Sequence, residues 1–167
     1  MSFKKHAIFP PCNPYVKNGE TLLQKFLYTH NPMCSVKQKR TCIKFEFSAS
    51  CAHSIVNIPA HHIYSFIQHI LFDLQELAIF LAQHNYAFHN IVIADIHFLD
   101  KTAILINPQK IIHVPSDNEN SNLSTDISLR ALALILHNII ITHPDKPTIP
   151  IFTPVQRFIY NHCPNIK

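Results

Sequence analysis

The side chains that could do chemistry gather between His84 and Asn107, where polar groups interrupt apolar residues. Asp95 lies in the apolar run IVIADI, and an aspartate in such a setting can serve as a general base or a metal ligand. It can equally be an outward-facing strand residue or the acceptor of a turn hydrogen bond. His84 and His89 flank a polar loop, where they either brace its backbone or lie at a helix C-terminus, which the helix dipole favours.

Glycine is almost absent, with Gly19 as the single example. Phosphate-binding loops of the P-loop and dinucleotide types need several glycines in one short segment, so both classes are excluded. Turns and helix ends that need positive φ must then use Asn, Asp or His. Because the chain is rich in Asn, we expect Asn at such positions.

Cysteine and histidine form no recognisable metal or nucleophile pattern. The five cysteines are an odd number without a CxxC pair, as is typical of reduced thiols in a non-secreted protein. Asp73 and Glu76 are too far in sequence from any His/Cys pair to name as an acid–base dyad. We expect no metal site, because zinc-ligand spacing is lacking even in the closest His/Cys grouping, Cys51, His53, His61 and His62.

Length and composition indicate one globular domain. The chain has 167 residues, of which 47% are hydrophobic, and its net charge of +4 is too diffuse to demand nucleic acid. Polar residues interrupt the best candidate for a membrane span, and the N-terminus lacks the apolar stretch of a secretory signal. We therefore expect a soluble, intracellular (cytoplasmic) protein with no membrane span.

Apolar periodicity predicts two strong helices in residues 58–167 with a small β region between them. The first helix is expected from Pro59 to about Gln83, and the second over Asp126–Thr142, capped by Thr125 or Asp126. The other expected elements are a loop at His84–Asn90, strands at Ile91–Ile96, Thr102–Ile106 and Lys110–Val114, a turn at Leu99–Lys101, a mobile polar loop at 115–125, and a short helix at Thr153–Asn161.

Residues 1–57 are expected to form a small N-terminal α/β segment. Three prolines make 1–20 an extended arm, and the alternation of RTCIKFEFS predicts a strand at Arg40–Ser48. A polar loop is expected at 30–39. It carries a basic cluster at its end, formed by Lys37, Lys39 and Arg40. Further expected elements are strands at His6–Phe9 and Ser54–Ile58 and a helix at Thr21–Tyr28.

This order of elements resembles the C-lobe of a protein kinase. IYSFIQHILFDLQELAIFLAQHN is similar to the long helix before the kinase catalytic loop, and HNYAFHNIVI looks like a degraded form of that loop. AILINPQ resembles the strand leading into Asp-Phe-Gly, and TDISLRALALIL resembles the helix whose Asp anchors the catalytic loop. The resemblance implies an α+β, reduced protein-kinase-like C-lobe, with long buried helices and a small β-hairpin. It also implies that His84 and Asp126 anchor the loop.

The departures from the family pattern argue against catalysis. With Asn90 at the metal-binding Asn, no Asp remains in the loop to orient the substrate. An alternative alignment makes Asp95 the base but leaves no Asn at the right spacing. Asn107 replaces the metal-binding Asp of Asp-Phe-Gly and lacks its charge. Lys44 resembles the kinase ATP-binding lysine, but too few residues follow it to house the rest of an upper lobe.

We therefore expect a catalytically inactive, pseudokinase-like protein, an adaptor or regulator that binds another protein and uses no ATP–Mg²⁺. Two alternatives stay open. One is a structural or nucleic-acid-associated subunit that docks through 1–20 and 37–40 on a larger assembly. The other is a divergent phosphotransferase that uses Asp95 or Asn90 with a metal.

Overall fold

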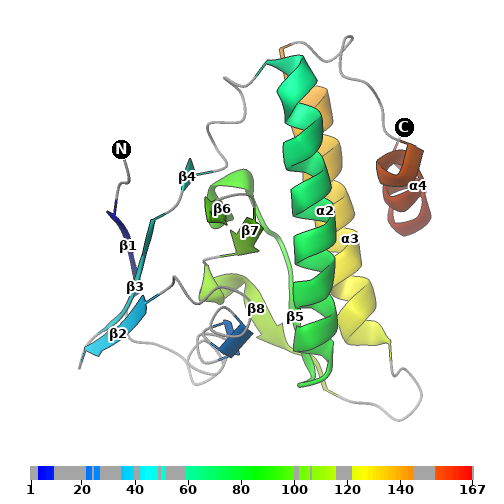
Figure 1. Cartoon of the computed structure of the whole chain (residues 1–167). Coiled ribbons are helices and arrows are strands. Elements are labelled where there is room, and N and C mark those ends of the chain that lie inside the picture. The colour runs from blue at the N-terminus through cyan, green and yellow to red at the C-terminus, as the bar shows by residue number, and fades with distance from the viewer. Residues whose placement is uncertain are drawn as a thin grey trace.

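The protein has an α+β fold in which two long helices run side by side, with small antiparallel sheets beside them (Figure 1). The computed structural model describes residues 4–9, 22–23, 25–26, 35–39, 42–48, 50–51, 59–99, 102–105, 107–115, 122–144 and 153–166. Every structural statement below concerns these residues.

Helix α2 (Ala60–Ala82) confirms the first predicted helix. Pro59 is its N-cap, where the missing N–H and fixed φ of proline cost nothing. At 23 residues the helix is about 35 Å long. Its buried residues recur at three- and four-residue spacing and form the centre of the core: Ile63, Ile67, Ile70, Leu74, Leu77 and Leu81.

Helix α3 (Leu123–Thr142) packs along α2, and α4 (Thr153–His162) packs against α3. The predicted short C-terminal helix is thereby confirmed. The predicted start of α3 is wrong by one turn, because the helix begins at Leu123 with Asn122 as N-cap, so neither Thr125 nor Asp126 caps it. Ser124 and Ser128 are both buried on this first part of α3.

The β region between the helices differs from the prediction in two respects. A strand, β5 (Tyr86–Phe88), lies inside the expected 84–90 loop and pairs with β8 (Ile111–His113). The expected strand at Ile91–Ile96 is wrong: Ile93–Asp95 form a 3₁₀ turn, and β6 (Ile96–Leu99) follows it. β6 pairs with β7 (Thr102–Leu105), which confirms the predicted hairpin with a shifted first strand.

An N-terminal antiparallel sheet has the order β1-β3-β2. Strands β1 (Lys4–Phe9) and β3 (Cys42–Ser48) confirm two predictions, but β2 (Ser35–Lys39) replaces part of the expected polar loop at 30–39. β4 (Ser50–Cys51) pairs with β6. The predicted strand at Ser54–Ile58 and most of the 115–125 loop lie outside the described residues, as do Arg40 and the arm from 10 to 20.

A partly buried carboxylate links the hairpin to α2. The Ala103 backbone N–H donates a 2.7 Å hydrogen bond to Oδ2 of Asp73. Burial raises the pKa of Asp73 above its ordinary value, and the Ala103 hydrogen bond and the nearby His69 act in the opposite direction. Asp73 is therefore a structural link between helix and hairpin.

Both α2, from His61, and α3 are long and apolar enough to cross a membrane by length and composition alone. Core helices of soluble proteins meet the same criterion, and the inner faces of α2 and α3 pack against each other and against β5 here.

Candidate functional site

The loop from His89 to Asp95 connects β5 to β6, and backbone contacts hold both ends of β5 against β8. Asn85 and Asn90 have positive φ, 61° and 46°. The predicted use of asparagine at left-handed positions is thus confirmed. The carbonyl of Asn85 accepts from the Val114 N–H, and that of Asn90 accepts from Lys110 Nζ at 2.8 Å. The two left-handed residues therefore bracket β5 where the chain turns.

Asp95 is buried, with 6% of its surface exposed, and its carboxylate turns back onto its own loop. The Val92 N–H donates to Oδ2 at 2.9 Å, and the Asp95 N–H donates to the Val92 carbonyl at 2.9 Å. This reciprocal pair closes the 3₁₀ turn. A carboxylate that accepts a backbone N–H in this way competes with strand formation, which explains why the apolar run does not continue as a strand.

Asn107 and Lys110 complete the surroundings of Asp95. Nδ2 of Asn107 donates to Oδ1 of Asp95 at 2.9 Å, and Lys110 Nζ lies 3.7 Å from Oδ2. Oδ1 of Asn107 accepts from the Gln109 N–H at 3.1 Å. The two contacts of Asn107 agree on one orientation of its amide, with NH₂ toward the carboxylate. Both oxygens of Asp95 are therefore engaged within the protein.

The predicted site residues divide into those that meet and those that do not. Asp95 and Asn107 are in direct contact, and Asn90 joins them through its backbone carbonyl and Lys110. His84 lies at the end of α2, where Nδ1 is 3.0 Å from the Phe80 carbonyl and the ring contacts that of Phe80. Of the two alternatives given for His84 from the sequence, this position corresponds to the histidine at a helix C-terminus.

Asp126, the predicted loop anchor, is exposed on α3, and no hydrogen bond or ion pair joins its side chain to the described part of the loop. Ser128 provides such a contact instead: its Oγ accepts from the Phe88 N–H at 3.0 Å. Ser128 is fully buried, so this hydrogen bond fixes β5 on α3. Its position on the same helical face as Leu132 and Leu136 was a usable signal, since a hydroxyl on a core face needs a partner.

No model of a known protein family matches the chain, and no curated protein matches it significantly.

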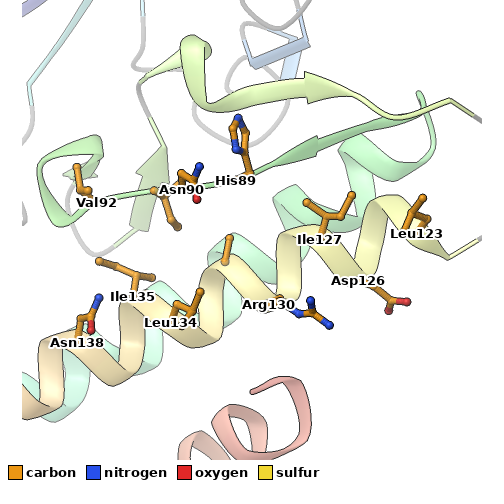
Figure 2. Close-up of a pocket in the computed structure, with 12 residues that line it drawn as sticks. His89, Asn90, Val92, Leu123, Asp126, Ile127, Arg130, Leu134, Ile135 and Asn138 are labelled. Carbon is orange, nitrogen blue, oxygen red and sulfur yellow. The ribbon is translucent and has the colours of Figure 1, made fainter. Parts of the chain in front are cut away.

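A groove of about 640 Å³ lies between the 89–92 loop and α3 (Figure 2). Ile91, Ala131 and Ile135 are its buried apolar residues, and Val92 on the loop side is half exposed. Polar groups line its edges: His89 and Asn90 on the loop, and Asp126, Arg130 and Asn138 on α3. Among the described residues, no group of three or more His, Cys, Asp or Glu side chains is placed to hold a metal ion. An apolar floor with polar edges suits protein or peptide binding.

Proposed function

We propose that this chain is a reduced kinase-like C-lobe without phosphotransfer activity that acts by binding another protein. The support for kinase ancestry is the arrangement of two pairs of strands around the 89–95 loop. β5 pairs with β8 and packs on α3, while β7 pairs with β6 and packs on α2. The loop after β5 and the residues after β7 meet through the hydrogen bond between Asp95 and Asn107. In a kinase, the catalytic loop and Asp-Phe-Gly meet at such a place.

In this proposal, Asp95 rather than Asn90 occupies the position of the kinase catalytic-loop Asn, opposite the position of the Asp in Asp-Phe-Gly. Kinases hold two Mg²⁺ ions between a catalytic-loop Asn and the Asp of that triplet. Here the corresponding pair is Asp95 and Asn107, with the acid and the amide exchanged. Asn107 directs its NH₂ group, not its oxygen, at Asp95, so the two side chains bind each other where a kinase would bind metal.

The observation that carries the proposal is that both oxygens of the buried Asp95 carboxylate accept hydrogen bonds from the chain itself. Oδ1 accepts from Asn107, while Oδ2 accepts from the Val92 N–H and is ion-paired with Lys110. A general base needs a free lone pair within reach of its substrate, and a metal ligand needs one directed at the ion. Asp95 in this arrangement stabilises the loop.

The support for protein binding is the groove beside this loop. Half-exposed Val92 projects at its edge in Figure 2, and exposed leucines follow on α3. Apolar side chains gathered on a concave surface are a common feature of sites that bind other proteins. We infer that a partner contacts the 89–92 loop.

Thermal shift with ATP and Mg²⁺ tests the inactive half of the proposal, together with ATP turnover. We expect no nucleotide-dependent shift and no turnover. A stabilisation by ATP–Mg²⁺ that Asn107→Ala abolishes, or turnover that Asp95→Ala abolishes, would favour the divergent phosphotransferase and overturn the proposal.

Affinity capture tests the binding half. Proteins retained by the wild-type chain should be lost with Val92→Glu, which places a charge on the loop side of the groove. They should be kept with Ile79→Glu, a matched change at an exposed residue of α2 outside the groove. Equal capture by both variants would contradict partner binding at this loop.

A further inference from the structure

We propose that two copies of this chain associate through α3, antiparallel about a twofold axis near Ser128. The stripe also forms the α3 side of the groove described above, so this proposal names a second copy as the occupant of that side, whereas the function proposed above concerns a partner on the 89–92 loop.

The outer stripe of α3 is apolar and open. Leu123, Leu134 and Ile141 are each exposed by 41–44%. At about 100° per residue these three positions fall within roughly 20° of one another around the helix. Ile127 lies beside them, and the stripe runs between the 89–92 loop and α4 (Figure 2).

Two opposite charges lie along the same edge of this stripe. Asp126 and Arg130 are one helical turn apart, and both are exposed. In Figure 2 both project from α3 on the side away from the 89–92 loop. The two side chains do not form an ion pair with each other, although an acid four residues before a base is well placed for one. Among the described residues, the charge of Arg130 acts on the Cys163 thiol, whose pKa it lowers against the larger effect of burial.

A second copy is the partner that matches this order of charges. A twofold axis across α3 near Ser128 places Asp126 opposite Arg130 of the partner subunit, and Arg130 opposite Asp126 of the partner subunit. Counting along the helices, the same axis brings Leu123 to within one residue of the level of Leu134 of the partner subunit. An isologous interface requires this kind of self-complementarity, because every contact between two different residues occurs twice, once in each direction.

The alternatives match less well. Parallel packing in register would set each charge against its own kind, and a partner of a single charge would neutralise one residue and repel the other. Antiparallel self-association pairs both charges and covers the leucines in one arrangement, which favours it over other occupants.

Sedimentation velocity over a wide range of concentration tests the proposal. We expect the wild type to dimerise reversibly. Asp126→Arg alone and Arg130→Asp alone should each weaken the dimer by about tenfold or more, because each creates two like-charge contacts. Ile79→Glu, on the exposed face of α2, should leave the dimer unchanged.

The decisive experiment mixes the two charge variants, Asp126→Arg and Arg130→Asp. In an equimolar mixture, the arginine introduced at position 126 of one subunit meets the aspartate introduced at position 130 of the other. The remaining pair keeps its natural charges, so the mixture should recover dimer although each variant alone does not. Matching thermal melts of the variants establish that both are folded, and Leu134→Glu should weaken the dimer independently.

Three results would overturn the proposal. They are a wild type that stays monomeric throughout, single variants that associate as the wild type does, and a mixture that fails to recover dimer. A monomeric wild type would leave the stripe to a different protein, and it would not affect the nucleotide experiments on Asp95 and Asn107.

Discussion

The side-chain amide of Asn107 donates a 2.9 Å hydrogen bond to the buried carboxylate of Asp95, across the junction between the 89–95 loop and the end of β7. The residue is held from its other side, because its Oδ1 accepts from the Gln109 N–H. The amide therefore stabilises a buried charge by donating a hydrogen bond, and it joins two segments that are 12 residues apart in sequence.

Asn107→Asp should reverse this relationship. Two carboxylates would then face each other, with Lys110 as the nearest cation, and we expect a loss of about 2 kcal/mol in the free energy of unfolding. Urea denaturation with and without Mg²⁺ measures it, and Mg²⁺ should recover part of the loss. Unchanged stability would mean that the contact between Asn107 and Asp95 contributes little.

Ser128→Ala should detach β5 from α3. The buried Phe88 N–H would lose its acceptor, which costs about 1–3 kcal/mol. Ser124→Ala is the matched control, since Ser124 is also a buried serine of α3, but its hydroxyl does not hold a strand among the described residues. Denaturation curves of the two variants that coincide would contradict the role of Ser128.

The two long helices and the hairpin could be predicted because their apolar residues repeat at regular spacing over many positions, as Ile63 to Leu81 do in α2. Residues 91–96 could not be predicted in this way. Their apolar run is typical of a strand, but one polar contact, from the Val92 N–H to Asp95, closes a 3₁₀ turn there and delays β6 to Ile96.

The site was predicted in part for a similar reason. Asp95 and Asn107 were identifiable as polar residues in apolar surroundings, but their contact depends on which strands pair. Ser128 was missed because Asp126 is the more conspicuous residue in the resemblance, and the choice between them depends on the rotation of α3. That rotation brings Ser128 under β5 and leaves Asp126 exposed.

Asp73 should make stability depend on pH. Burial raises its pKa in the folded state above the ordinary value of 3.8, so the folded state binds the proton more tightly than the unfolded state. The protein therefore gains stability as pH falls through the raised pKa, and loses that contribution as pH rises again. Protonated Asp73 keeps an oxygen that accepts from the Ala103 N–H.

Asp73→Asn removes this titration and retains an acceptor. Urea denaturation between neutral pH and pH 4 should show the wild type gaining stability relative to Asp73→Asn on acidification. Asp73→Leu removes the acceptor as well and should be less stable at every pH, by about 1–3 kcal/mol. A difference between wild type and Asp73→Asn that does not vary with pH would contradict the raised pKa.

Asn85 should tolerate glycine better than alanine. Its φ of 61° lies in the left-handed region, where a residue with Cβ other than Asn or Asp loses about 1–2 kcal/mol. We expect Asn85→Ala to lose about 1 kcal/mol and Asn85→Gly to remain close to the wild type. Thermal denaturation of both variants checks this, and equal losses would argue against the left-handed conformation.

The most direct test of an inert, kinase-like platform is the binding of Mn²⁺ with ATP, followed by the EPR signal of the free ion. Because both oxygens of Asp95 are engaged by Val92, Asn107 and Lys110, adding the wild type should leave the signal at its level in Mn²⁺ and ATP alone, and Asp95→Asn should behave identically. Stoichiometric loss of the signal with the wild type, abolished by Asp95→Asn, would show that Asp95 holds a metal and would contradict the central claim.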